Sequence, residues 1–419
     1  MAGFDSETYL RLTGEQRLRE GDSIGAAPFN TVLVAAAAAL VAVAAITTAD
    51  AQAIIDDYGL AVTLRRDRHL ISGQPPRPLA SAAPDIGRVR VVPCRRVIDQ
   101  PWGRLTILYV AFTDHATTLR VDLRLDVPSQ RFSSGHPIPT WARRLSVTDS
   151  RGTTAMAEFS GGGRIGGSIW HGQYEVRPLL DVDAAWIELL GERVELTAKP
   201  ARIEAWAEPL PAQDPAVQHL WERAATLNDF HDPHLALEAT TTALVAAGAL
   251  PVHDPRIGAA RAVLTVLRPD NAAPAGNPGD APEPWPSLLA RWGQTGGPSG
   301  TIAVGSITPS FDGITAAIIK LESRDEHFSI KVELVPSVRT GLPYRDLPDQ
   351  QHLTWWAADN LGNRYLGEQG SWDPRGGRGQ GSIGFWPALD TRASSIDLMP
   401  TATTARAVIR VPLPWAEHE

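Results

Sequence analysis

The fold is decided by the stretch LRVDLRL at residues 119–125, in which apolar residues alternate strictly with charged ones. A second stretch, FSIKVEL at residues 328–334, alternates in the same way 209 positions later. Successive side chains of a strand point to opposite faces of its sheet. Such alternation is therefore typical of a strand with one face in a core and the other in water. The sequence predicts two β modules that are copies of each other.

The segments on either side repeat at nearly the same offset. LTILYVAF at 105–112 and ITAAIIKLE at 314–322 precede the alternating stretches, and we expect each to be the first strand of a hairpin. DSRG at 149–152 and DNLG at 359–362 follow them. Both predict tight turns, because an opening Asp accepts backbone N–H groups and a closing Gly tolerates a positive φ.

A corner motif recurs as LDVDA at 180–184 and LDTRA at 389–393, before what we expect to be the last strands of each module. Each module reads as about eight short strands separated by turn residues. This layout resembles bacterial immunoglobulin-like modules. The resemblance implies an antiparallel β-sandwich for each module and no particular activity.

The helical parts repeat more weakly, with LVA at 40–42 and again at 244–246. Helix starts are predicted by the capping box TTAD at 47–50 and by Asp-Pro at 214–215 and 254–255. The predicted fold class is α+β and multi-domain: two tandem copies of a small helical module followed by an immunoglobulin-like antiparallel β-sandwich. The expected bounds are 1–72 and 211–268 for the helical modules, 86–210 and 299–414 for the β modules, and 269–298 for a Pro/Gly-rich linker.

Residues 29–46, FNTVLVAAAAALVAVAAI, are the one candidate for a membrane span. A spanning helix needs about 20 apolar residues, and Ala inserts less readily than Leu or Ile. The corresponding stretch of the second copy contains Glu238. We therefore expect a buried helix, packed against a helix at 48–66, and no membrane. The alternative is a membrane-anchored regulator with a single span.

Charge and cysteine content narrow the classes of protein. The formal net charge is −8, which argues against a nucleic-acid binder, since phosphate neutralisation needs clustered Lys and Arg. The single cysteine, Cys94, excludes an intrachain disulfide and a C-x-x-C metal site. These features suit a cytoplasmic protein.

Tryptophan is abundant, with 13 Trp against 6 Tyr. Trp355 and Trp356 are adjacent, so on a strand they must face opposite ways, one into the core and the other toward solvent or another module. With Trp372 they are candidates for contacting a partner or a glycan. The alternative is that the extra tryptophans pack the core or a module interface.

Two Gly-rich segments and one His-rich segment are candidate ligand sites. Residues 161–167 and 376–381 each contain an arginine, Arg164 and Arg378, and could hold an anion as loops; the alternative is a plain hairpin connection. FHDPH at 230–234 could offer imidazole and carboxylate ligands, but Asp-Pro there also reads as a helix start. We expect no metal and no cofactor.

No nucleophile elbow or triad signature is present in the sequence, and His136 belongs to none. The sequence-based hypothesis is a non-enzymatic structural or protein-binding molecule whose partner is another protein or a second copy of itself. The alternative is glycan or small-ligand binding through the tryptophan-rich β modules. The candidate contact residues are Trp355, Trp356, Trp372, Arg164 and Arg378.

Overall fold

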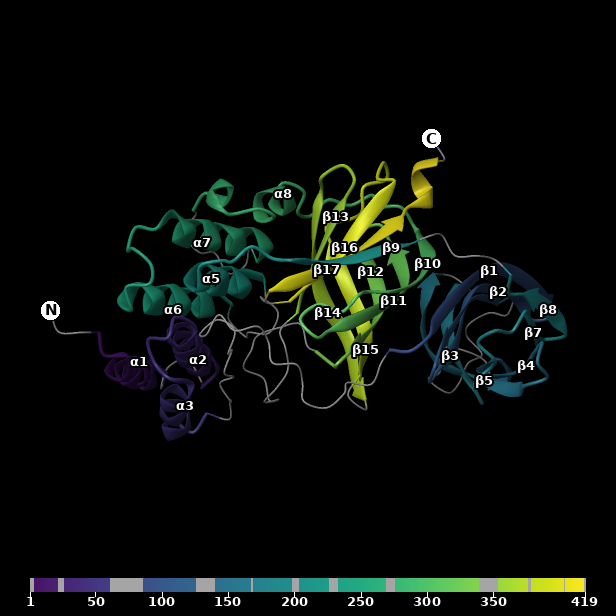
Figure 1. Ribbon diagram of the computed structural model, residues 1–419, viewed down its shortest axis with the longest axis horizontal. Helices are drawn as coiled ribbons and strands as arrows, with labels where there is room; N and C mark the ends of the chain where they lie inside the picture. Colours follow the sequence, from purple (N-terminus) through teal and green to yellow (C-terminus); the bar gives the residue numbers. More distant parts are fainter. Residues whose placement is uncertain are drawn as a thin grey trace.

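The computed structural model places a group of helices, one β-sheet and a second β-sheet in a row (Figure 1). The sheet in the middle is the C-terminal one, and the sheet of residues 89–195 lies at the far end from the helices. The described residues are 4–21, 26–60, 86–125, 140–166, 169–197, 203–225, 233–268, 276–338, 353–375, 378–402 and 404–417.

The first sheet is antiparallel, and its strand order is β1-β2-β3-β6-β5-β4-β7-β8. Its edges approach each other, because Arg90 on β1 donates to the carbonyl oxygens of Ala184 (3.1 Å) and Leu196 (2.6 Å). Arg96 of β1 pairs with Glu192 of β8 at 3.1 Å. The sheet is therefore nearly closed, like a barrel. Its strands are β1 (Val89–Gln100), β2 (Gly103–Thr113), β3 (Thr117–Leu125), β4 (Arg144–Asp149), β5 (Thr154–Gly166), β6 (Ile169–Arg177), β7 (Trp186–Leu189) and β8 (Glu192–Glu195), with the 3-10 turn η2 (Thr140–Arg143) before β4.

The second sheet is also antiparallel, with the order β10-β11-β12-β15-β14-β13-β16-β17-β9. Its core is aromatic: Trp355, Tyr365, Phe328 and Phe385 are fully buried, and the rings of the last two stack with centroids 4.8 Å apart. Its strands are β9 (Glu204–Pro209), β10 (Gly300–Ile307), β11 (Thr315–Ser323), β12 (Phe328–Val335), β13 (Thr354–Asp359), β14 (Arg364–Arg375), β15 (Arg378–Trp386), β16 (Ser395–Thr401) and β17 (Ala405–Pro412), with the 3-10 turn η6 (Pro414–Glu417) at the end.

The two alternating stretches that predicted strands are strands. Leu119, Val121 and Leu123 of β3 are at most 1% exposed, as are Ile330 and Val332 of β12. Strand β3 lies between β2 and β6, and β12 lies between β11 and β15. Leaving β9 aside, both sheets share one strand order when their strands are counted from the first. That the two halves are copies of each other stays a prediction.

The predicted immunoglobulin-like sandwich is wrong. Each β region forms one continuous, nearly closed sheet around a single core, where a sandwich has two facing sheets. Alternation shows only that each strand has one buried face. The strands of a sandwich and those of a barrel both have one, so the pattern does not distinguish the two folds. In addition, β9 was expected in the first β module but pairs with β17 of the second sheet.

The prediction of two separate helical modules is also wrong. The helices that precede the first sheet in the sequence and the helices that follow it pack into one core, which we call the helical cluster. A short amphipathic helix cannot bury its apolar stripe alone, so two small sets gain by sharing one core. The helical cluster consists of α1 (Ser6–Gly21), α2 (Ala26–Ala42), α3 (Thr48–Asp57), α5 (Pro215–Ala225), α6 (Pro233–Ala246), α7 (Pro255–Leu267), the 3-10 turn η5 (Pro278–Asp280) and α8 (Trp285–Leu289).

The alanine-rich stretch at 29–46 is mainly helix α2, as predicted, and its residues 31–42 are buried in protein. Its chief partner is α6, not the helix at 48–57. Small side chains let the two backbones approach closely, which explains the abundance of Ala on α2. Within the described residues no helix is both long and apolar enough to cross a membrane.

The predicted helix starts are confirmed. The hydroxyl of Thr47 accepts the backbone N–H of Asp50 at the start of α3. Asp214 and Asp254 each accept the backbone N–H two residues ahead, at 2.9 Å and 3.0 Å, before a proline in the first turn. These side chains supply partners that the first N–H groups of a helix otherwise lack.

The predicted turns at 149–152 and 359–362 are confirmed as well. Asp149 accepts the backbone N–H groups of Arg151 and Thr153, both at 2.9 Å. Asp359 makes the same pair of bonds, to the residues two and four positions ahead, also at 2.9 Å. The turns end at Gly152, with a φ of 86°, and at Gly362, with a φ of 88°. A residue with a side chain adopts such a conformation only at a cost in energy.

Candidate functional site

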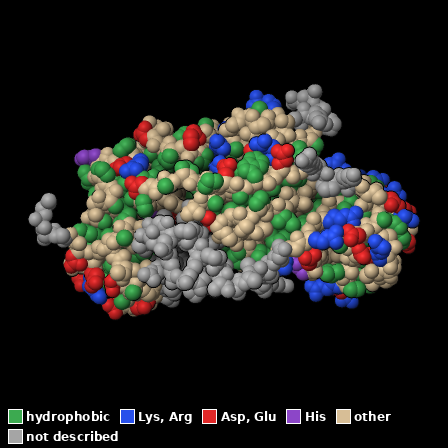
Figure 2. Space-filling view, viewed as in Figure 1, with side chains coloured by type: hydrophobic (Ala, Val, Ile, Leu, Met, Phe, Trp, Pro, Cys, Tyr) green, Lys and Arg blue, Asp and Glu red, His purple; other side chains and the backbone are tan. Residues whose placement is uncertain are grey.

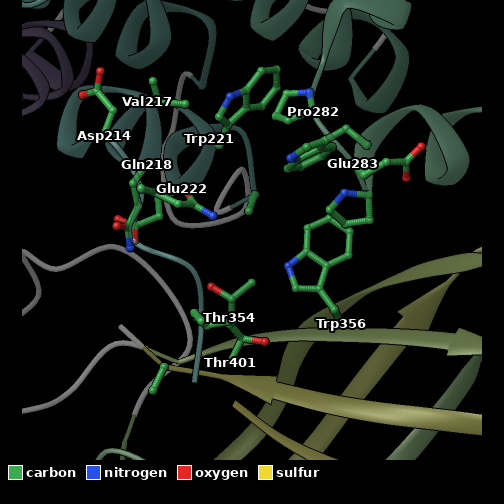
Figure 3. Close-up of a pocket in the computed structure, with 16 residues that line it drawn as sticks. Asp214, Val217, Gln218, Trp221, Glu222, Pro282, Glu283, Thr354, Trp356 and Thr401 are labelled. Atoms are coloured by element: carbon green, nitrogen blue, oxygen red, sulfur yellow. The ribbon is translucent and has the colours of Figure 1, made fainter. Parts of the chain in front are cut away.

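A cleft of about 320 Å³ lies where the helical cluster meets the second sheet. Helix α5 supplies one wall, the segment 282–285 that enters α8 supplies the next, and β13 with the end of β16 supplies the floor. Figure 3 shows the labelled side chains arranged around this space, with Thr354 and Thr401 on the sheet side. We call it the tryptophan cleft.

Three of its described lining residues are tryptophans from three different elements. The rings of Trp221 on α5 and Trp285 on α8 are 5.8 Å apart and inclined by 33°. Trp285 in turn meets Trp356 of β13 at 5.2 Å, with the ring planes at 90°. Trp221 and Trp285 are 8% and 3% exposed, and Trp356 is half-buried. The rings therefore form an apolar corner and not a flat platform.

Three carboxyl groups also line the tryptophan cleft, those of Asp214, Glu222 and Glu283. Glu222 accepts a hydrogen bond from Gln218 at 2.9 Å, and Glu283 accepts one from the Ser287 hydroxyl at 2.9 Å. Burial raises the pKa of Glu222, against the opposing effects of the Gln218 bond and the nearby Arg223 charge. Among the described lining residues there is no Lys, Arg or His, so the ionisable side chains described there are all acidic.

Sequence reasoning placed Trp355 and Trp356 on opposite faces of one strand, and they lie so. Trp355 is fully buried in the core of the second sheet, whereas Trp356 lines the tryptophan cleft. It missed Trp285, which it assigned to a linker. The signal was present: Pro-Trp-Pro-Ser-Leu-Leu at 284–289 is an apolar turn, and Trp285 and Leu288 belong to the core of the helical cluster.

Of the other candidate contacts, Trp372 packs against glycines of a neighbouring strand. The half-buried Trp372 lies against Gly379 and Gly381, where an added Cβ would come within 2.3 Å and 2.2 Å of its ring. The glycines thus make room for an indole, and both lie within strand β15 and not in a loop. Of the first Gly-rich segment, 161–166 lie in β5, and the side chain of Arg164 lies outside the described part.

Arg378 is engaged at the junction of the two sheets. Its guanidinium pairs with Glu333 of β12 at 3.1 Å, and Glu333 is 1% exposed. His115, in the turn between β2 and β3 of the first sheet, lies 3.2 Å from both side chains. Arg378, a residue expected to contact a ligand, therefore pairs with a carboxylate inside the second sheet and touches His115 of the first.

The remaining candidates form no reactive centre within the described chain. His231, Asp232 and His136 lie outside the described residues. The described residues contain no group of three or more His, Cys, Asp or Glu that could hold a metal ion. Cys94 is a half-buried strand residue, and burial raises the pKa of its thiol to about 11. A thiol with that pKa is a weak nucleophile at neutral pH.

Fold and site together describe a two-sheet protein whose helices close a cleft over the second sheet. No protein-family model matches the chain, and no curated protein matches it. A solved structure titled "The crystal structure of the conserved domain protein from Bacillus anthracis" aligns with 75% of this chain and 78% of its own, at 9% identity and a TM-score of 0.21. A similarity that weak carries no argument about fold or function.

Proposed function

We propose that the chain is a ligand-binding protein and that the tryptophan cleft holds a small organic ligand. One observation carries the proposal: indole rings from α5, α8 and β13 converge on a space of about 320 Å³. Clefts of about 300 Å³ or more, lined by aromatic rings and a few polar groups, are the usual form of small-molecule sites.

The composition of the walls supports this proposal over simple packing. Trp355, next in sequence to Trp356, is fully buried, so this sheet buries an indole completely where only packing is required. Trp356 is left half-buried beside an opening that also exposes Glu283 and Thr354. An apolar surface flanked by hydrogen-bonding groups can both bind and orient a ligand.

Binding of a protein partner or of a second copy of the chain stays a prediction with less support. Trp356 was the expected contact residue, and its ring is covered in part by Trp285 of the same chain. Trp372 and Arg378 are engaged within the second sheet and at the sheet junction. We propose no catalytic role, and a cytoplasmic location also stays a prediction.

The test is calorimetric titration with a panel of small molecules: choline, a neutral aliphatic alcohol, methyl glucoside and acetate. Binding of at least one member, lost in Trp356→Leu, supports the proposal. The matched control is Trp186→Leu, in which a half-buried tryptophan of the first sheet is removed far from the cleft. If no member binds, or if both variants lose binding equally, the tryptophan cleft is not a ligand site.

A further inference from the structure

We propose that the ligand of the tryptophan cleft is an organic cation that carries a substituted ammonium group. This inference rests on the proposed function and specifies its ligand class. It is drawn from the charge of the walls and from the arrangement of the indole rings.

The charged side chains among the described lining residues are all of one sign. Asp214, Glu222 and Glu283 line the cleft from α5 and from the segment that enters α8, and no basic residue stands among its described lining. Arg223 is the nearest cation along α5, but it does not line the cleft, and its Nε bonds to the buried His219 at 3.3 Å. Carboxylates gathered around a small, partly apolar space favour a positive ligand and disfavour a negative one.

The hydrogen bonds described for these carboxylates come from neutral donors, while the charges of Arg223 and Arg256 act on Glu222 and Asp214. Glu222 and Glu283 accept from an amide and a hydroxyl, and Asp214 accepts from the backbone N–H of Ala216. Hydrogen bonds of this kind orient a carboxylate without cancelling its charge. Burial of Glu222 disfavours its ionised form, and a cation bound beside it would favour that form.

The ring arrangement favours a compact cation over a flat ligand. The face of an indole carries partial negative charge, and cations bind over it. Because Trp285 and Trp356 are perpendicular, with Trp221 inclined to the first, the ring surfaces meet at a corner. A rounded ammonium group fits into a corner of this kind, as in aromatic cages for quaternary ammonium ions. A sugar ring stacks better on one flat face.

The experiment compares choline with 3,3-dimethylbutan-1-ol, its neutral counterpart with carbon in place of the charged nitrogen. Both are titrated into the full-length chain by calorimetry, and methyl glucoside serves as a third probe. We expect choline to bind about tenfold or more tightly than the neutral alcohol, since the two differ in charge and hardly in shape.

Two variants then test whether the preference for choline depends on a carboxylate of the cleft. Glu283 is exposed, so Glu283→Gln should fold normally, which circular dichroism checks. We expect it to weaken choline binding severalfold and to leave the alcohol unchanged. Glu326→Gln, an exposed carboxylate between β11 and β12, is the matched control and should change neither.

Each outcome has a separate meaning. If the alcohol or methyl glucoside binds as tightly as choline, and Trp356→Leu abolishes that binding, the cation inference is wrong and the proposed function stands. If choline is preferred but Glu283→Gln and Glu326→Gln weaken it alike, the preference does not arise in the cleft and the inference is also overturned. If none of the three probes binds but acetate does, and Trp356→Leu abolishes that binding, the cation inference is wrong and the proposed function stands. If neither the three probes nor acetate binds, the inference and the proposed function fail together.

Discussion

Trp285 of α8 meets Trp356 of β13 edge to face, with ring centroids 5.2 Å apart and planes at 90°. This contact joins the helical cluster to the second sheet and also forms one corner of the tryptophan cleft. A ligand that binds there touches both the helical cluster and the second sheet. Its binding energy therefore adds to the stability of their junction, because a ligand that binds only the folded state stabilises it.

The neighbouring tryptophans of β13 should respond differently to truncation. Trp355→Ala removes a fully buried ring from the core and should cost roughly 3–5 kcal/mol of unfolding free energy. Trp356→Ala removes a half-buried ring and should cost clearly less, while abolishing ligand binding. Urea unfolding of both variants measures the difference. Equal losses of stability would mean that Trp356 is simply a core residue.

The glycines of β15 should be intolerant of even one methyl group. In Gly381→Ala the new Cβ would lie 2.2 Å from the Trp372 ring and 2.4 Å from the carbonyl oxygen of Ser371. We expect a loss of roughly 1–3 kcal/mol from overpacking. Gly161→Ala on β5, whose Cβ would meet nothing within 4 Å, is the control and should be near neutral. Comparable effects of the two substitutions would contradict the packing role.

Stability should fall as the pH drops below about 6.5, and His219 should account for part of the fall. Burial, followed by the charge of Arg223, holds the pKa of His219 well below its usual value of 6.5. As the pH decreases, His219 therefore binds a proton at a higher pH in the unfolded chain than in the folded chain. The contribution is fully present above pH 6.5 and is lost as the pH decreases, by at most about 1.4 kcal/mol per pH unit.

His219→Gln is the variant that tests this origin, because its amide oxygen can still accept from Arg223 without titrating. Urea unfolding at pH 7.5 and pH 5.5 should show a smaller pH dependence for the variant than for the unmodified chain. If the variant and the unmodified chain lose the same unfolding free energy between pH 7.5 and pH 5.5, the titrating group is not His219.

The stability of the chain should depend on the arginine that pairs with the buried charge of Glu333. Arg378→Ala leaves that carboxylate 1% exposed and without its arginine, which should cost roughly 3–5 kcal/mol. Arg96→Ala, at an exposed ion pair, should cost about 1 kcal/mol or less. Thermal and urea unfolding compare the two. Indistinguishable losses would show that the buried pair stabilises the chain no more than the exposed one.

Local patterns predicted local structure well. The alternation at 119–125 predicted β3, and Asp214-Pro215 and Asp254-Pro255 predicted the starts of two helices, because period and capping depend on neighbours in sequence. The closing of each sheet and the union of the two helix sets depend on residues far apart in the chain, such as Arg90 with Leu196. No local pattern encodes those contacts.

The candidate site shows the same division. That Trp355 and Trp356 face opposite ways follows from strand geometry alone. That Trp285 meets both Trp356 and Trp221 does not follow from it, since the three residues come from separate elements of the helical cluster and the second sheet. The second Gly-rich segment also has a role that local sequence does not reveal. Glycine next to arginine is typical of anion loops, and here the glycines make room for Trp372, a residue on the neighbouring strand.

The most direct test of the tryptophan cleft is the indole N–H spectrum of the ¹⁵N-labelled chain, recorded during titration with choline and, separately, with methyl glucoside. Single Trp→Phe variants assign the signals. We expect one of these probes to shift the signals of Trp221, Trp285 and Trp356, while those of Trp186 and Trp206, which lie outside the cleft, stay in place. Shifts confined to other indoles, or no shifts with either probe, would contradict it.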